Sequence, residues 1–561
     1  MSRLRSALLV SAVLAVVGVM AAPASAAKPD FLNMSLESFD PLPKLETPTS
    51  DIAFWGDTAF VGNYDGLRTY DISDPVEGAD ESNRLADFQC FGPQNDPSVW
   101  DTDGNGEADL LVQSIDRTLT GPQCGAAATD HDDPNGWEGV RLFDVSDPAN
   151  PAFIKGIYLD CGSHTNTMYP DPVANNDADP TNDRLIVLIS SYPLRPGPTC
   201  GEANFDNTTN PFDGDPTSPG DPLHGVIQTV TIPLAGSPGA SAAGATEGPE
   251  LPIDYPGDPD NQFVWGEHGL LPTEEDPDIE LAARACHDSA VFTELMLVAG
   301  ACVEQGQLWT INESGPLAGL PDTSNPEWVF DQRNIDFHHS ATFSWDGEVV
   351  NFIDESFGSG CPTVNRGIGQ TGRMFFVDTD TGSRLSQFMI RRSHKPETPD
   401  YCSAHLGIPV PATDRYLLVN AWYTGGVDVI DFSNPRHPRE VAYYDDNGDE
   451  WSAYWYEQTG SDTTGPLNVF GTHGVEHVFH GEGEELEARG FESFLADVSA
   501  TRVGLDHLNP QTQEQVIETD VSAFAKKAKA STAKASARSQ AKVSKKAGKV
   551  RRKAVLRRLG P

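Results

Sequence analysis

The sequence predicts an all-β protein built from a repeated unit. The chain has 561 residues, of which 38% are hydrophobic, enough for a large packed core. Gly (51) and Pro (43) together make up about one residue in six. This composition is typical of many short strands joined by turns and argues against a helical bundle. A motif that recurs along the chain supports the same conclusion.

Each copy of this motif begins with Gly, continues as an alternating apolar strand that ends in Asp, and closes with a Ser-Asp/Asn-Pro turn. Asp side chains start turns, and Pro cannot donate to a strand ladder, so the motif marks the end of a strand. The copies begin at Gly66, Gly139 and Gly426, with weaker copies at Gly225, Gly306, Gly372 and Gly504. Long acidic Pro- and Gly-rich insertions explain why their spacing is irregular.

Other strand candidates flank the copies, such as Thr58–Gly62 before the first and Tyr416–Ala421 before the copy at Gly426. Three to four strands per repeat match one blade of a β-propeller. A blade cannot bury both of its faces alone, so the blades must close into a ring. We therefore expect a single seven-bladed β-propeller over residues 45–515. The alternative, a pair of β-sandwiches, would not explain seven matching turns.

The N-terminal residues have the pattern of an export signal. Arg3 and Arg5 precede an apolar run that ends in Ala24-Ser-Ala26, a small-residue cleavage site. This pattern predicts a signal peptide over 1–26, followed by an N-terminal segment over 27–44. An uncleaved membrane anchor is the alternative, but the run is short for a span. We expect a secreted protein, extracellular or cell-wall associated, with no membrane span after signal removal.

The charge is divided between an acidic body and a basic tail. Residues 521–561 hold 14 Lys and Arg and no Asp or Glu. Without these and the two Arg of the signal, 22 basic residues face all 83 acidic ones, a net charge of about −61. Such a body repels nucleic acid and anionic membranes. The Ala-, Lys- and Ser-rich tail, 516–561, should be disordered. It either contacts cell-wall polyanions or is a solvated extension, free or folded back on the body.

The eight cysteines agree with export. None forms a CxxC motif, and an even number of cysteines in an exported protein predicts disulfides. We expect sequential pairing, as Cys90–Cys124, Cys161–Cys200, Cys286–Cys302 and Cys361–Cys402. Only the third pair has local support, because Cys286 and Cys302 flank what reads as a single β-hairpin.

The first copy of the motif resembles a known repeat. The stretch Ala59-Phe-Val-Gly-Asn-Tyr-Asp-Gly-Leu-Arg-Thr-Tyr-Asp-Ile-Ser-Asp-Pro75 is similar to the LVIVD repeat of secreted bacterial β-propeller proteins. The resemblance is specific in the copies at Gly66, Gly139 and Gly426 and diffuse in the others. It implies a propeller fold and an extracellular setting. The family has no common reaction, so it brings no catalytic residues to this chain.

The segment from Asp101 to Asp109 has the ligand spacing of a calcium loop. The ligand candidates are Asp101, Asp103, Asn105, Glu107 through its carbonyl, and Asp109. Ca²⁺ takes 6–8 oxygen ligands, and this spacing provides them. Val112 replaces the Glu of an EF-hand, so the segment instead resembles the calcium hairpins of FG-GAP type in other propellers. We expect a structural Ca²⁺ site, the alternative being an acidic turn without metal.

Four consecutive predicted blades begin their first strand with histidine, at His164, His287, His338 and His405. The first strand of each blade lines the axis of a propeller, so these residues would form a ring. Four imidazoles can hold Fe, Cu, Zn or Ni. With a metal bound, Asp288 and His339 would lie in the surrounding layer. The alternative is structural, with each imidazole hydrogen-bonded to the backbone of a neighbouring blade.

A third cluster, His473, His477 and His480, lies in a Gly-rich stretch and is more typical of adventitious metal binding. No nucleophile motif or phosphate-binding loop is found in the sequence.

Two functions remain open at this point. The first is a secreted or cell-surface binding scaffold, stiffened by calcium and disulfides, that acts as a monomer on an unknown extracellular ligand. The alternative is a metalloenzyme, an oxidoreductase or lyase, with a histidine-bound transition metal on the propeller axis.

Overall fold

The structure is a computed structural model. It describes residues 29–41, 49–124, 137–159, 161–191, 225–256, 263–264, 282–283, 285–303, 305–332, 334–355, 360–362, 371–393, 402–446, 448, 450–461, 463–473 and 489–519. The predicted signal peptide and the basic tail beyond residue 519 lie outside the described residues.

The predicted all-β class is confirmed. Within the described ranges, the helical elements are α1 (Pro238–Gly244) and the 3₁₀ turn η1 (Glu81–Asn83). No helix in this part of the chain has the length and apolar character that a membrane span needs.

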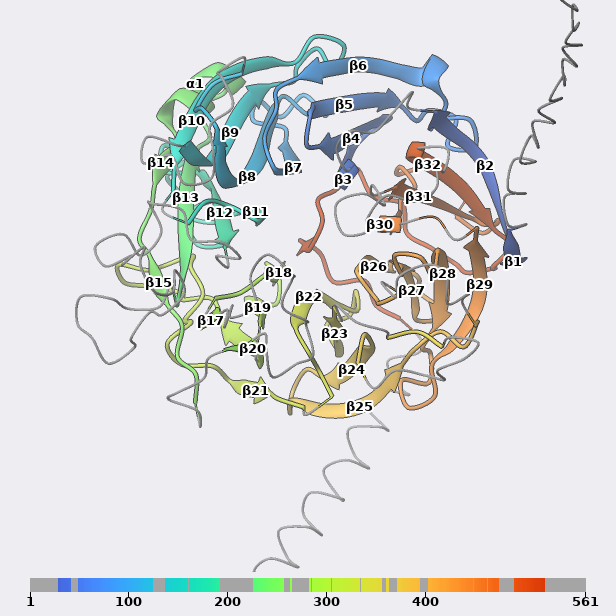
Figure 1. Cartoon of the computed structure of the whole chain (residues 1–561). Coiled ribbons are helices and arrows are strands. Elements are labelled where there is room, and N and C mark those ends of the chain that lie inside the picture. The colour runs from blue at the N-terminus through green and yellow to red at the C-terminus, as the bar shows by residue number, and fades with distance from the viewer. Residues whose placement is uncertain are drawn as a thin grey trace, which may run out of the picture.

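The first three sheets are antiparallel and follow one another along the chain (Figure 1). The first contains β3 (Thr49–Trp55), β4 (Thr58–Asn63), β5 (Gly66–Asp71) and β6 (Arg84–Gln89). The second contains β7 (Gln94–Trp100), β8 (Leu110–Thr120), β9 (Trp137–Asp144) and β10 (Ala152–Tyr158). The third contains β11 (Thr165–Pro170), β12 (Arg184–Ser190), β13 (Val226–Pro233), β14 (Thr246–Glu247) and β15 (Leu251–Pro252).

The next sheets repeat this order. The fourth contains β18 (Asp288–Phe292), β19 (Leu297–Cys302), β20 (Gln305–Thr310) and β21 (Trp328–Phe330). The fifth contains β22 (His338–Phe343), β23 (Val349–Asp354), β24 (Met374–Asp378) and β25 (Ser383–Phe388). The two-stranded pair β16 (Phe263–Val264) and β17 (Ala282–Ala283) precedes the fourth.

The last meanders form one nine-stranded sheet, because β26 and β30 pair in parallel at their starts. Its first half contains β26 (Leu406–Val410), β27 (Leu417–Ala421), β28 (Val427–Asp431), β29 (Arg439–Asp445) and β1 (Asp30–Leu32). Its second half contains β30 (Glu450–Trp455), β31 (Leu467–His473), β32 (Arg489–Ala496) and β2 (Met34–Pro41).

Figure 1 shows these sheets arranged as a ring around one axis, with β3, β7, β11, β18, β22, β26 and β30 nearest the centre. Apolar clusters fill the space between neighbouring sheets. One cluster, for example, joins Phe292 and Phe343 of the fourth and fifth sheets. Side chains that face the centre therefore contact those of other inner strands rather than these clusters.

The N-terminal segment closes the ring. Strand β2 pairs antiparallel with β32, with Met34 opposite Ala496, so residues from near the start of the chain supply the outer strand of the last meander. The sequence placed this segment outside the repeats, because it lacks the Gly-to-Pro motif.

The Ser-Asp/Asn-Pro turns connect neighbouring sheets. In the first copy, Asp71 and Asp74 accept hydrogen bonds from the backbone N–H groups of Ser73 and Val76, which fixes the turn. The carbonyl of its Pro75 accepts a hydrogen bond from Ser493 of β32. In the same way, Pro148 accepts from Thr69 at 2.6 Å and Pro435 accepts from Ser386. The motif therefore ends a strand and also links one sheet to the previous one.

The prediction of a motif copy at Gly504 is wrong, because the residues after Gly504 do not form the third strand of a sheet. Its residues include only the two-residue strand β33 (His507–Leu508), which pairs with β3. The strand at the position equivalent to the other copies is β32. The segment from Leu505 instead contacts several inner strands: Asn509 bonds Val99 of β7, Thr512 bonds Met168 of β11, and β34 (Thr512–Gln513) pairs with β18.

Three of the four predicted disulfides are confirmed, as Cys90–Cys124, Cys286–Cys302 and Cys361–Cys402. Cys161 is also disulfide-bonded, and its predicted partner Cys200 lies outside the described residues. In the first pair, Cys90 directly follows β6 of the first sheet and Cys124 lies in the segment after β8 of the second sheet, so the disulfide links two neighbouring sheets.

The C-terminal segment should contribute measurably to stability through Gln513. Its side chain accepts a hydrogen bond from the Phe343 amide at 3.2 Å and donates one to the Phe343 carbonyl at 3.0 Å. Both groups are buried, so Gln513→Ala leaves two backbone groups without partners. We expect this variant to lower the free energy of unfolding by about 2–4 kcal/mol in urea denaturation. Gln515→Ala, at an exposed position two residues away, is the control; equal losses in both variants would contradict the assignment.

Candidate metal centre

The starts of the inner strands bring histidines from four sheets together. His164 precedes β11, His287 precedes β18, and His405 precedes β26. The fourth, His339, is the second residue of β22. Consecutive ring centroids are 4.4 Å apart for His164 and His287, 3.8 Å for His287 and His339, and 4.3 Å for His339 and His405. We call these four side chains the histidine cluster.

The structure corrects one member of the predicted ring, His338. The strand β22 has a register shift against β23 between His338 and Ser340, so His339 is an extra residue that bulges. A β-bulge turns one side chain to the other face of the strand. His338 consequently points between the sheets, where its Nδ1 lies 3.0 Å from the Val303 carbonyl and its ring packs near Phe330 and Phe352. His339, expected in the surrounding layer, takes the place in the cluster.

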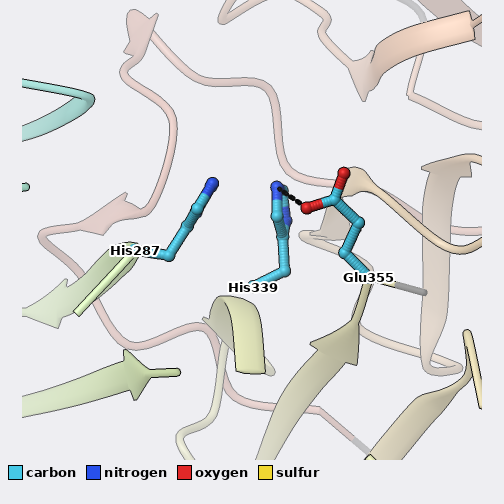
Figure 2. Close-up of side chains that lie close together, drawn as sticks. All are labelled: His287, His339 and Glu355. Atoms are coloured by element: carbon cyan, nitrogen blue, oxygen red, sulfur yellow. Dashed lines mark ion pairs between the residues drawn. The ribbon is translucent and has the colours of Figure 1, made fainter. Parts of the chain in front are cut away.

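A carboxylate that the sequence did not single out completes the site. Glu355 follows β23, next to β22 in the same sheet. Its Oε2 is 3.5 Å from His339 Nε2, and its Oε1 is 4.0 Å from His405 Nε2. One ligand atom each of His287, His339 and Glu355 lies within 4.8 Å of the other two. Figure 2 shows the Glu355 carboxylate pointing at His339, with His287 alongside (Figure 2).

The outer two histidines are held through Nδ1. His164 Nδ1 is 3.1 Å from Asp116 Oδ2, and His405 Nδ1 hydrogen-bonds the Trp451 carbonyl of the next inner strand. A partner at Nδ1 fixes the tautomer in which Nε2 keeps its lone pair, the form that binds metals. The contact of His405 also matches the structural alternative, in which an imidazole bonds a neighbouring blade. The two roles use different nitrogens of one ring.

Burial sets the charge of the site. It lowers the pKa of His287 and His339 well below the usual histidine value, and the other imidazoles of the cluster lower both further. Burial also lowers the pKa of His405 to about 3 and raises the pKa of Glu355 to about 8. The imidazoles of His287, His339 and His405 are therefore neutral at pH 7, as metal ligation requires.

Two residues around the cluster adopt a backbone conformation that L-residues rarely take. Tyr423 has φ 49° and Gln94 has φ 76°. The Tyr423 hydroxyl donates to Glu355 Oε1 at 2.5 Å, and Gln94 Nε2 lies 3.4 Å from His164 Nε2. Such a conformation costs about 1–3 kcal/mol per residue and is found at sites where the surroundings impose it. Here it positions two side chains that orient members of the site.

The predicted calcium loop connects β7 and β8. Carboxylate oxygens of Asp101, Asp103 and Asp109 lie within 4.8 Å of one another. Asp101 accepts backbone N–H groups of Gly104 and Gly106 at 2.7 Å each, which folds the loop around its carboxylate. The side chain of Asn105 accepts from the Glu107 amide at 2.8 Å. The structure thus brings the three aspartates together, while Asn105 shapes the turn.

The third predicted cluster lies mostly outside the described residues. His473 ends β31 and is buried, whereas His477 and His480 are not described.

The comparisons with known proteins agree with the repeat motif. The sequence model of the LVIVD repeat matches residues 416–446, which contain β27, β28, β29 and the turn at Pro435. This segment is an LVIVD repeat. No curated protein matches the chain. The LVIVD repeat is a propeller-type repeat, and together with three disulfides it fits a stable extracellular protein.

Sequence reasoning could have found Glu355 through one signal. Two acidic residues, Asp354 and Glu355, follow Val349–Ile353, one strand after the paired His338-His339, and in a meander the end of that strand lies near the start of the strand that carries the histidines. The bulge at His339 has no such signal, because the gapless alignment of His287-Asp-Ser-Ala with His338-His-Ser-Ala favours the wrong residue.

Tyr423→Phe should weaken the fold even in the absence of metal. The substitution removes the donor to the buried Glu355 carboxyl and leaves the aromatic packing on His405 intact. We expect a loss of about 1–2 kcal/mol in the free energy of unfolding, measured by urea denaturation. The control is Tyr158→Phe, whose side chain is 42% exposed. No difference between the two variants would show that the hydroxyl does not support Glu355.

Proposed function

We propose that this chain is an exported, seven-bladed β-propeller that binds a divalent transition-metal ion on its axis. The meanders around one centre, the turns that link them and the LVIVD repeat support the propeller. The disulfides and the N-terminal sequence pattern support export.

The main support for the metal site is that one potential ligand atom each of His287, His339 and Glu355 lies within 4.8 Å of the other two. All three residues are buried. Two imidazoles and one carboxylate are a donor set that suits Fe(II) or Zn(II). Three protein ligands would leave coordination positions open on such an ion, which would then supply a Lewis acid able to polarise water or dioxygen. His164 and His405 lie beside the set and would orient what binds there.

This arrangement favours the metalloenzyme class, oxidoreductase or lyase, over a purely structural ring of histidines. A purely structural ring needs only imidazoles that bond backbone groups, as His338, His405 and His287 do. It does not need a carboxyl beside them, whereas Glu355 lies with His287 and His339 in one group of potential ligands. A cation would stabilise the charged form of that carboxyl, whose pKa burial now raises to about 8.

Because His339 lies in the histidine cluster and its neighbour His338 points away from it, variants of these two residues test the metal site. Purified protein should contain about one Fe or Zn per chain by elemental analysis, and His339→Ala should lower the affinity for that metal by at least about 100-fold. His338→Ala removes the neighbouring imidazole, which points away from the site, and should keep the metal. Thermal unfolding followed by circular dichroism checks that both variants fold. Equal metal content in both variants, or no metal in the parent protein, would sink the proposal.

We also propose that Ca²⁺ binds the loop from Asp101 to Asp109. The three carboxylates that meet there and the backbone carbonyls of the turn offer the oxygen ligands that Ca²⁺ takes. The Gly106 carbonyl accepts a hydrogen bond from Trp55 Nε1 at 3.1 Å, so the loop packs against the first sheet. An ion in this loop would stabilise the contact between the first and second sheets.

Chelation tests the calcium loop. Since an ion that binds only the folded state stabilises it, EGTA should lower the melting temperature of the parent protein by at least about 2 °C. Asp103→Asn should lose at least half of this shift, because it weakens a ligand and keeps the turn. Asp147→Asn is the matched control, since Asp147 accepts the Ala149 amide in a similar exposed turn. An unchanged melting temperature in EGTA would contradict a stabilising ion.

A binding scaffold is the second candidate function. The disulfides in the described ranges and the acidic loops favour a rigid surface that presents extracellular loops to a ligand. In this case the basic tail, 516–561, would contact cell-wall polyanions. Calcium without a transition metal in the purified protein would favour the scaffold over the enzyme.

A further inference from the structure

The segment from Leu505 to Ile517 contacts the inner strands at their later residues, away from the histidine cluster. The cluster forms where these strands begin. Asn509, by contrast, bonds the backbone of Val99 near the end of β7. Gln513 bonds Phe343, the last residue of β22. Since a strand of this length spans about 20 Å, the segment and the histidine cluster lie at opposite ends of the axis.

A cavity of about 320 Å³ is lined by this segment and by Trp345, which follows β22. Its volume falls in the range of sites that bind small molecules. Trp345 and Leu505 give the cavity an apolar wall, and both are buried. The polar part of the lining comes from the segment itself and includes Asp506, His507, Glu514 and Gln515. An apolar wall with a few polar groups is the usual composition of a ligand site.

The other polar groups of the lining already have partners in the protein. Trp345 Nε1 donates to the Pro409 carbonyl at 2.6 Å. Thr512 Oγ1 donates to the Met168 carbonyl at 3.0 Å, and the Asn509 amide is bonded to β7. These groups hold the segment against the inner strands, so recognition of a ligand falls to the carboxylates of the lining.

One of these carboxylates is held in place by a packed imidazole. The His507 ring stacks on Trp55, with centroids 4.2 Å apart and 12° between the planes, and meets Trp100 edge-on at 5.4 Å. His507 Nε2 lies 3.2 Å from Glu514 Oε1. A side chain fixed by packing and by a neighbouring hydrogen bond is a better binding group than one that moves freely in solvent.

The charge around the cavity is negative. Asp506 and Glu514 belong to its lining, and the Glu294 carboxylate lies beside it, where it accepts the Val516 amide. Among the described residues that line the cavity, none is lysine or arginine. The strongly acidic body adds to this field, which raises the local concentration of cations.

The spacing of these groups favours an organic cation over a metal ion. Within the described ranges, three potential metal ligands lie within 4.8 Å of one another only at the histidine cluster and in the loop from Asp101 to Asp109. An alkylammonium ion needs no such convergence. Its ammonium group donates hydrogen bonds to carboxylates, while its methylene groups pack on an apolar wall such as Trp345 and Leu505 provide.

We propose that this cavity binds a primary alkylammonium group, with its charge at Glu514 and Asp506 and its methylenes against Trp345. The site shares no residue with the histidine cluster or with the calcium loop, so it does not depend on either metal proposal.

Two sources offer this chemistry, a free small amine and a lysine of the basic tail. The Ile517 amide donates to the Trp345 carbonyl at 2.8 Å, so the chain passes the cavity shortly before the tail. The first tail lysine in the sequence is Lys526, nine residues after Ile517. A tethered group of this kind competes at an effective concentration of about millimolar.

Calorimetric titration of the full chain with 1,4-diaminobutane tests the site. Glu514→Gln keeps the size of the side chain and removes its charge, so it should weaken binding by at least about 10-fold. Glu250→Gln, at an exposed position outside the cavity, is the matched control and should bind as the parent does. 1,4-Butanediol, which has hydroxyls in place of the ammonium groups, should not bind. Thermal unfolding checks that each variant folds.

A second arm identifies the source of the ammonium group. It uses a full-length variant in which the Lys and Arg residues of the tail are replaced by Gln. If a tail lysine occupies the cavity, this variant should bind 1,4-diaminobutane at least about 10-fold more tightly than the parent, and adding Glu514→Gln should cancel the gain. If the ligand is a free amine, parent and tail variant should bind equally.

Three outcomes would overturn the proposal. The first is the absence of binding in both the parent and the tail variant. The second is equal affinity in the Glu514→Gln and Glu250→Gln variants on both backgrounds, which would place the amine elsewhere on the acidic surface. The third is equal binding of 1,4-butanediol, which would show that the cavity does not select for charge.

Discussion

Closure of the ring is the constraint on which the rest of this structure depends. Each sheet exposes two faces and buries them only against its neighbours. Strand β2 completes the last meander from the other end of the chain, and the Ser493 hydroxyl reaches the Pro75 carbonyl of the first sheet. The same Ser-or-Thr to Pro link recurs between other neighbouring sheets. A local motif that ends a strand thus also links neighbouring sheets through its Pro carbonyl.

Closure in turn dictates the chemistry of the axis. Apolar residues pack between sheets, so the residues that begin the inner strands meet one another at the centre instead. In this chain they are histidines and acids, and both are buried. Burial favours the neutral form of each, which leaves lone pairs and carboxyl groups gathered with little positive charge. The strained conformations of Gln94 and Tyr423 indicate that side-chain placement at the centre outweighs local backbone preference.

The fold was more predictable from the sequence than the site. Gly66, Gly139 and Gly426 mark real third strands of their sheets, because the Asp and Pro that follow act through local turn chemistry. The copy at Gly504 and the role of β2 depend on pairing between residues more than 400 positions apart, which no local pattern encodes. Three of four histidines were placed correctly by register. His338 was wrong because one bulged residue changes the face of the strand, and Glu355 was missed because it comes from a second strand.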